Sequence, residues 1–258
     1  MHPLTCYELG DKFSLEYALK FGLLPSVYVV ENPQLYLDTY VTTYLREEIL
    51  QEGITRNIGV FARFLEVASF SQGNVLNYSE IAREAAIERR VVANYFNILI
   101  DLLLGFELPA FIKRAKRRMI SHPKFYLFDA GVYRTIRPKG PLDTVEEIDG
   151  ATLETLFLQH LRAINDYYHL GYQLYYWRTS NNIEVDFIVY GEKGLYAFEI
   201  KRTKKIGPSD LKGLLAFGED YKMAKLFLIY GGDHEEYHGN IHVIPFTKAL
   251  FMLKEILK

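Results

Sequence analysis

The pattern of apolar and polar positions along the chain changes near residue 140. Before that point, apolar residues recur mostly at helical spacing. The spacing predicts helices over 34–51, 56–70, 80–85 and 88–104. Two shorter apolar runs, 106–112 and 124–128, predict strands, and scattered Gly and Pro make the first 30 residues short helices joined by turns. The first half is therefore expected to be mainly helical, with one hairpin.

The second half alternates between helices and strands. It follows the stretch Arg137-Pro138-Lys139-Gly140-Pro141, where two prolines and a glycine mark a domain boundary. Helices are predicted over 151–168, 209–217 and 247–257, and strands over 174–177, 184–190, 195–201, 225–230 and 241–244. We predict three segments: a helical segment over 1–52, a second unit over 53–138 and a mixed-sheet domain over 139–258. The fold class is α/β, or α+β over the whole chain.

The strands within 184–201 flank a short glycine-bounded turn, which predicts a β-hairpin. Pairing them around this turn places Asp186 opposite Glu199 and Glu184 opposite Lys201, all on one face of the sheet. Like charges that lie directly opposite each other destabilise a sheet unless something offsets them. A divalent cation would do so, because hard cations bind carboxylate oxygens.

These carboxylates predict a metal-dependent hydrolytic site. Asp186 and Glu199 would bind Mg²⁺ or Mn²⁺, and Glu154, in the first turn of the preceding helix at the edge of its buried face, would share the metal. Such a metal lowers the pKa of bound water and polarises a phosphate. Lys201 would stabilise the charge on that phosphate. The alternative is that Glu184 pairs with Lys201 while the other carboxylates are solvated at a strand end.

A second pattern predicts contacts with nucleic acid. The helices at 80–85 and 88–104 are joined by a tight turn, and the following hairpin carries a basic loop, so together they predict a winged helix. The cations expected to contact DNA are Arg89 and Arg90 at the start of the second helix, Lys113, Arg114, Lys116, Arg117 and Arg118 in the loop, and Arg202, Lys204 and Lys205 after the hairpin. The alternative is a common packing unit with a solvated charged face.

Four of these residues resemble the signature of the PD-(D/E)XK nuclease superfamily. They are Glu154 in a helix, Asp186 in a strand, and Glu199 and Lys201 in the next strand. The set is most similar to archaeal Holliday-junction resolvases and restriction endonucleases. The resemblance implies a restriction-endonuclease-like mixed sheet with these residues in catalysis.

A closer resemblance covers nearly the whole chain. The recurring segments are Leu4-Thr5-Cys6-Tyr7-Glu8-Leu9, Gly22-Leu23-Leu24-Pro25, Tyr44-Leu45-Arg46-Glu47-Glu48-Ile49, His122-Pro123-Lys124-Phe125-Tyr126-Leu127-Phe128-Asp129 and Tyr176-Trp177-Arg178. They are similar to the C-terminal part, a domain of unknown function (four-one-four-three), of prokaryotic AAA-type ATPases. This resemblance implies that segment 1–52 corresponds to the end of the ATPase lid region and that the chain acts with an ATPase.

The chain departs from those ATPases in one respect. It contains no G-x-x-x-x-G-K-[ST] phosphate loop, so no nucleotide cofactor and no ATP hydrolysis are expected from it, and an ATPase partner would be encoded separately. One hypothesis is a DNA endonuclease or nuclease-like domain. The others are a catalytically inactive DNA- or partner-binding module and a protein-binding effector of an ATPase or a toxin–antitoxin-like system. Junction-cleaving relatives act as dimers, and since no sequence feature requires one, a homodimer stays open.

Composition limits the expected mode of DNA binding and the expected cellular compartment. The 258 residues carry a net charge of −2, which excludes a globally basic nucleic-acid coat and leaves local patches to bind DNA. Cys6 is the single cysteine, which suits a reducing compartment. The N-terminus lacks a signal-peptide pattern, and no apolar run reaches the length of a membrane span. We therefore expect a cytoplasmic protein without membrane contact.

Histidines outside these patterns are expected to be unimportant for catalysis. His234 to His238 matches the zinc-protease pattern H-E-x-x-H, but glycines on both sides leave too few residues for a sustained helix. His160 and His169 are expected on the solvated flank of the 151–168 helix.

Overall fold

The computed structural model describes residues 2–44, 58–138, 140 and 144–258. The first half contains α1 (Cys6–Leu9), η1 (Gly10–Lys12), α2 (Leu15–Phe21), η2 (Pro25–Tyr28), α3 (Pro33–Thr39), the π-helical turn η3 (Tyr40–Tyr44), α5 (Ile58–Ser69), α6 (Tyr78–Ala85), α7 (Arg89–Asp101), β1 (Gly105–Leu108), β2 (Lys124–Leu127) and α8 (Ala130–Ile136). The end of the helix predicted over 34–51 lies outside the described residues, as does part of the boundary predicted at 137–141. Asn77 caps α6 by accepting a hydrogen bond from the Glu80 amide.

The second half contains α9 (Val145–Tyr167), β3 (Gln173–Arg178), β4 (Glu184–Gly191), β5 (Gly194–Lys201), η4 (Pro208–Leu211), α10 (Lys212–Asp220), β6 (Lys225–Tyr230), β7 (Glu236–His238), β8 (Ile241–Pro245) and α11 (Phe246–Ile256). Its six-stranded sheet has the order β3-β4-β5-β6-β8-β7. β4 pairs antiparallel with both β3 and β5, whereas β5, β6 and β8 are parallel. The predicted class, mixed helices and sheets with a helical N-terminal part, is confirmed.

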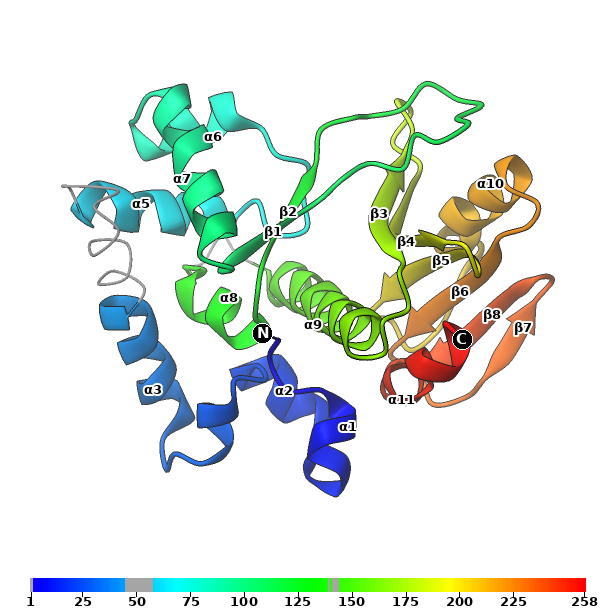
Figure 1. Ribbon diagram of the computed structural model, residues 1–258, viewed down its shortest axis with the longest axis horizontal. Helices are drawn as coiled ribbons and strands as arrows, with labels where there is room; N and C mark the ends of the chain where they lie inside the picture. The colour runs from blue at the N-terminus through cyan, green and yellow to red at the C-terminus, as the bar shows by residue number, and fades with distance from the viewer. Residues whose placement is uncertain (1, 45–57, 139, 141–143) are drawn as a thin grey trace.

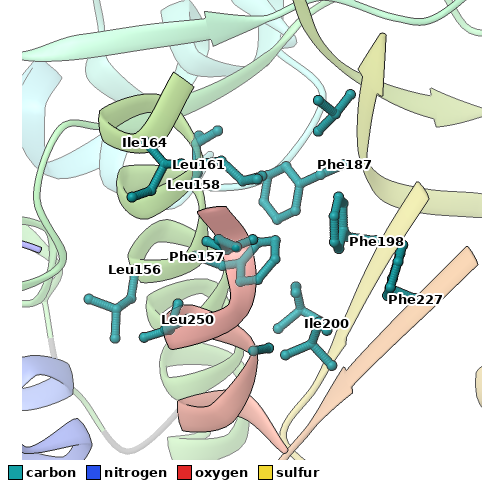
Figure 2. Packing of buried hydrophobic residues seen from close by; sticks show 14 of the residues in the cluster. Leu156, Phe157, Leu158, Leu161, Ile164, Phe187, Phe198, Ile200, Phe227 and Leu250 are labelled. Atoms are coloured by element: carbon teal, nitrogen blue, oxygen red, sulfur yellow. The ribbon is translucent and has the colours of Figure 1, made fainter. Parts of the chain in front are cut away.

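Helix α9 connects the two halves, lying between the helices of the first half and the sheet (Figure 1). Its residues Phe157 and Leu161 pack with Phe187 and Phe198 of the sheet and Leu250 of α11, as Figure 2 shows. Helix α10 covers the opposite face, where its apolar residues pack against side chains of β3 and β6. Burial of both sheet faces explains why β4 and β5 read as nearly continuous apolar runs.

Strand β4 carries an irregularity at the level of Asp186. Its pairing with β3 shifts between Trp177, which pairs with Val185, and Tyr175, which pairs with Ile188. The extra residue in β4 is the mark of a β-bulge. The side chains of β4 therefore stop alternating strictly between the two faces of the sheet at Asp186.

His160 contradicts its expected place on the solvated flank, because its side chain is fully buried on α9. Its Nε2 accepts a hydrogen bond from the Cys6 amide at 3.0 Å, and its Nδ1 donates to the Leu156 carbonyl at 2.8 Å. The ring therefore attaches the N-terminal segment to α9. Burial, partly opposed by the Leu156 hydrogen bond, lowers the pKa of His160 to about 4.

We expect His160 to make folding sensitive to mild acid. Its pKa in the folded chain is lower than the ordinary unfolded value of about 6.5, so the unfolded chain takes up the proton first and stability falls as pH drops from about 6.5 to 4. The loss from this group is about 3 kcal/mol. Urea unfolding at pH 7 and pH 4 measures it, with His160→Gln showing a smaller loss and the exposed His169→Gln behaving as wild type. Equal pH dependence in wild type and His160→Gln would contradict this role.

Candidate active site

Four predicted residues converge at one end of the central strands. Glu154 comes from α9, Asp186 from β4, and Glu199 and Lys201 from β5. Asp186 and Glu199 are each only 7% exposed, and Glu154 is half-buried. The negative charge of Asp186 raises the pKa of both glutamates, after the larger effect of burial, so the three carboxylates share one electrostatic environment.

The hairpin register is confirmed where the strands pair, from Gly191 opposite Gly194 to Phe187 opposite Phe198. The β4–β5 ladder ends there, next to the bulge, and the Asp186 carboxylate instead accepts a hydrogen bond from the Ile200 amide at 2.8 Å. Asp186 therefore reaches the backbone directly beside Glu199. The predicted proximity of the two carboxylates arises from this hydrogen bond rather than from a ladder pair.

Glu199 has one satisfied and one unsatisfied oxygen. Its Oε1 accepts a hydrogen bond from Lys201 Nζ at 2.6 Å, whereas its Oε2 is buried without a hydrogen-bond partner. Burial first, and then the charge of Asp186, raise the pKa of Glu199 well above its ordinary value despite the ion pair with Lys201. A buried carboxylate oxygen in this state favours an additional cation or proton.

Glu154 is held by a hydrogen bond from the hydroxyl of Tyr126 at 2.8 Å. Burial and the Asp186 charge raise the pKa of Glu154 to about 7, although Lys124 and the Tyr126 hydrogen bond lower it. The glutamate lies close to the loop before α6, since a Cβ on Gly73 would be 3.0 Å from its Oε2. Glu154 therefore titrates near neutral pH at the junction of the two halves.

Lys124 is a member of the site that sequence reasoning missed. It is 2% exposed at the start of β2, where its ammonium pairs with Glu184 and lies 3.9 Å from Asp186. Burial lowers the pKa of Lys124, but the charges of Glu154, Glu184 and Asp186 outweigh burial and raise it. The only sequence signal is a lysine opening an otherwise apolar strand, a residue type that is seldom buried without an ionic partner.

Glu184 differs from its expected arrangement. The hairpin register predicted it opposite Lys201, but Glu184 pairs with Lys124 and with Arg178 Nη1, the latter at 3.3 Å. The bulge and the neighbouring strand β3, where Arg178 lies directly opposite Glu184, account for the difference. The alternative in which Glu184 neutralises Lys201 is therefore wrong, and Lys201 remains with Glu199.

The donor set suits a hard divalent cation in charge and chemistry. Glu154, Asp186 and Glu199 supply carboxylate oxygens, and the orphaned Oε2 of Glu199 is an unused donor. Within residues 2–44, 58–138, 140 and 144–258, no three His, Cys, Asp or Glu side chains are already grouped as metal ligands. Binding would therefore require the carboxylates to turn toward a shared ion.

The strands that flank the basic loop, β1 and β2, pair as a two-stranded antiparallel hairpin that follows α6 and α7 in the chain. The loop between these strands reaches over β3 toward α10 (Figure 1). Arg117 there forms ion pairs with Asp220 and Glu219 of α10, at 2.8 and 3.0 Å. The loop is thus attached to the sheet domain, and Arg117 is engaged in this attachment.

The other predicted cations lie in several places. Arg202 pairs with Glu146 and Asp149 of α9, each at 3.0 Å. The exposed cations are Lys113, Arg114, Lys116 and Arg118 in the loop, Arg89 and Arg90 at the start of α7, and Lys204 and Lys205 after β5. The Lys113 ammonium lies over the Tyr190 ring, four residues or about 13 Å along β4 from Asp186. Their DNA contacts stay predictions.

The H-E-x-x-H match does not form a zinc-protease helix. Glu236–His238 is strand β7, paired with β8, and both histidines of the motif are exposed. Consecutive residues in a strand point to opposite faces, so the spacing that would align two ligands on a helix is lost.

The described part of the chain holds no helix with the length and apolar character needed to span a bilayer. Residues 12–143 match the domain of unknown function DUF8612, and residues 149–249 match the domain of unknown function DUF4143, which confirms the expected domain for that region. The uncharacterized proteins Rv2008c of Mycobacterium tuberculosis and Mb2031c of Mycobacterium bovis are each 27% identical over 236 residues, 90% of this chain and 52% of theirs. The chain spans about half the length of these curated relatives.

Proposed function

The chain belongs to the family described as domain of unknown function DUF8612, and we propose that it is a Mg²⁺- or Mn²⁺-dependent DNA endonuclease. The observation that carries the proposal is the convergence of Glu154, Asp186 and Glu199 beside Lys201, with a buried, unpartnered oxygen on Glu199. Three electrostatically coupled carboxylates with adjacent lysines suit a cation and a phosphodiester.

Each residue has a distinct part in the proposed reaction. Asp186, Glu199 and Glu154 would hold the divalent cation, which supplies an activated water and polarises the phosphate. The Lys201 ammonium, fixed at 2.6 Å from Glu199, would stabilise negative charge that develops on the phosphate oxygens. Lys124 neutralises Glu184 and part of the charge of Asp186, which keeps the cluster from repelling an anionic substrate.

The test is cleavage of labelled single-stranded, duplex, flap and four-way-junction DNAs with Mg²⁺, Mn²⁺ or EDTA. We expect cutting of at least one substrate with either metal and none in EDTA. Absence of cutting by a folded protein whose melting temperature also fails to respond to Mn²⁺ would reject the proposal.

A catalytically inactive DNA- or partner-binding module is the second candidate. The observation favouring it is that Lys124 and Lys201 already pair with the acidic side chains, while no three ligands are pregrouped among the described residues. In that case DNA binding would persist in Asp186→Ala and Glu199→Ala and would weaken when Lys116 and Arg118 are neutralised. An AAA-type ATPase encoded separately, and a homodimer, stay proposals for both candidates.

Tyr126→Phe is expected to move the pH dependence of metal binding. Glu154 must ionise to bind a cation, so Mn²⁺ affinity should rise as pH increases through about 7. The Tyr126 hydrogen bond lowers the pKa of Glu154, so its loss should shift the rise in affinity toward higher pH. Calorimetric titration with Mn²⁺ between pH 6 and 8.5 measures the shift, with Tyr190→Phe as the control. A profile unchanged by Tyr126→Phe would remove Glu154 from the metal site.

A further inference from the structure

A polar cleft of about 750 Å³ adjoins the candidate active site. We propose that this cleft holds a single-stranded arm of the DNA substrate, so that the preferred substrate is a duplex carrying such an arm next to the cut. The inference rests on the proposed nuclease function and names its substrate class. The lining of the cleft includes Tyr78, Ser79, Glu80, Arg89, His122 and Arg178.

The cleft is continuous with the carboxylate cluster through two sets of contacts. Arg178 lines the cleft and also pairs with Glu184, which in turn binds Lys124. The loop before α6 runs from Gly73, adjacent to Glu154, into the cleft, and Val75 in this loop bridges to Lys124. A strand lying in the cleft would therefore reach the carboxylates without leaving the protein surface.

The lining suits phosphates and unstacked bases. Arg89 lines the cleft and is exposed at the start of α7, where the positive end of the helix dipole adds to its charge. Arg178 has its Nε buried without a hydrogen-bond partner. The rings of Tyr78 and His122 offer stacking surfaces.

The negative side chain in the cleft is locally compensated. Glu80 accepts a hydrogen bond from Asn77 Nδ2 at 3.1 Å and lies 4.0 Å from the Arg83 guanidinium. Arg89 and Arg178 therefore set the sign of the charge that the cleft presents to a ligand.

The dimensions favour a single strand. A volume of about 750 Å³ lies in the range of small-molecule sites and has room for about one or two nucleotides. Binding of a splayed strand through arginines and aromatic rings is the usual mode for single-stranded nucleic acid. The carboxylate cluster would then meet the strand where it joins the duplex.

Anisotropy titrations in EDTA test the cleft independently of cleavage. We expect Arg89→Gln together with Arg178→Gln to weaken binding of an oligothymidine at least tenfold and to reduce its log–log salt slope by about 1.4. Binding of a blunt duplex should change less. Arg89→Gln alone should give half the change in slope, and Arg63→Gln, an exposed arginine outside the lining, should match wild type.

A cross-link tests the position of the arm. The only cysteine, Cys6, is buried, so Ser79→Cys can be labelled selectively with a benzophenone. We expect cross-links to the unpaired arm of a flapped duplex and few to a blunt duplex, with Glu255→Cys giving neither. Equal cross-linking of both DNAs, or wild-type oligothymidine binding by the arginine variants, would overturn the inference. If wild type still cleaves DNA with metal in that case, the proposed nuclease function is retained and only the cleft is rejected. If the arginine variants lose single-strand binding but wild type cleaves no DNA, the cleft is a binding site and the nuclease function is rejected.

Discussion

Glu199→Gln is expected to abolish metal-dependent DNA cleavage while leaving the protein at least as stable as wild type. The carboxylate would bind the cation and is paired with Lys201, so its loss removes both a ligand charge and the partner that fixes the ammonium. We expect the cleavage rate to fall by about 10³-fold or more. Rates on a flapped duplex in saturating Mn²⁺ measure this effect.

The stability of the same variant follows from the pKa of Glu199. Burial and Asp186 raise this pKa above its unfolded value, so the folded chain retains a proton that the unfolded chain has already released. Stability therefore decreases as pH rises through the unfolded pKa, and glutamine removes that cost. Denaturant unfolding at pH 5 and pH 8 should show a stability advantage for Glu199→Gln that grows with pH.

The control for both measurements is Glu192→Gln, an exposed position in the turn of the same hairpin. It should match wild type in rate and in pH dependence. Retention of cleavage by Glu199→Gln would exclude this carboxylate from the reaction. A destabilised Glu199→Gln would show instead that the charge contributes to the fold.

The sequence predicts the hairpin part of the site well because the information there is local. Alternating and continuous apolar positions, together with the turn, define which residues of β4 and β5 meet from Phe187 to Gly191. The bulge was not predicted, since it depends on how β3 pairs with β4 across the shift near Tyr175. Glu154 could be placed because helical periodicity put it at the edge of an apolar face.

Contacts between segments far apart in the chain were beyond sequence reasoning. Lys124 and Asp186 are separated in the chain by helices α8 and α9 and strand β3, and no periodicity links them. The attachment of Arg117 to α10 depends in the same way on tertiary packing, and it anchors a loop that the sequence predicted to contact DNA. Burial of His160 was missed because its partner, the Cys6 amide, lies in a segment whose position the pattern does not determine.

Lys124→Met is expected to be the most destabilising single change near the site. The lysine is buried, and its removal leaves Glu184 and Asp186 without their shared cation, although Glu184 keeps Arg178. Loss of one partner from a buried ionic cluster costs about 3–5 kcal/mol, because the remaining charges are desolvated. Urea unfolding in EDTA measures the loss, and Lys193→Met, exposed in the hairpin turn, should be near neutral. The double variant Lys124→Met/Glu184→Gln should regain part of the lost free energy of unfolding, because the second change removes one of the uncompensated charges.

The response of Lys124→Met to metal separates the two candidate functions. If Glu154, Asp186 and Glu199 bind a divalent cation, the variant has more uncompensated negative charge and should be stabilised by Mn²⁺ more strongly than wild type. A ligand at about one hundred times its Kd contributes about 2.7 kcal/mol to the folded state, which is large enough to measure beside the expected loss. Glu199→Gln introduced into Lys124→Met should abolish the extra response. If Mn²⁺ stabilises neither wild type nor Lys124→Met, the lysines are the permanent counter-ions of the cluster, and the inactive binding module becomes the better description of the chain.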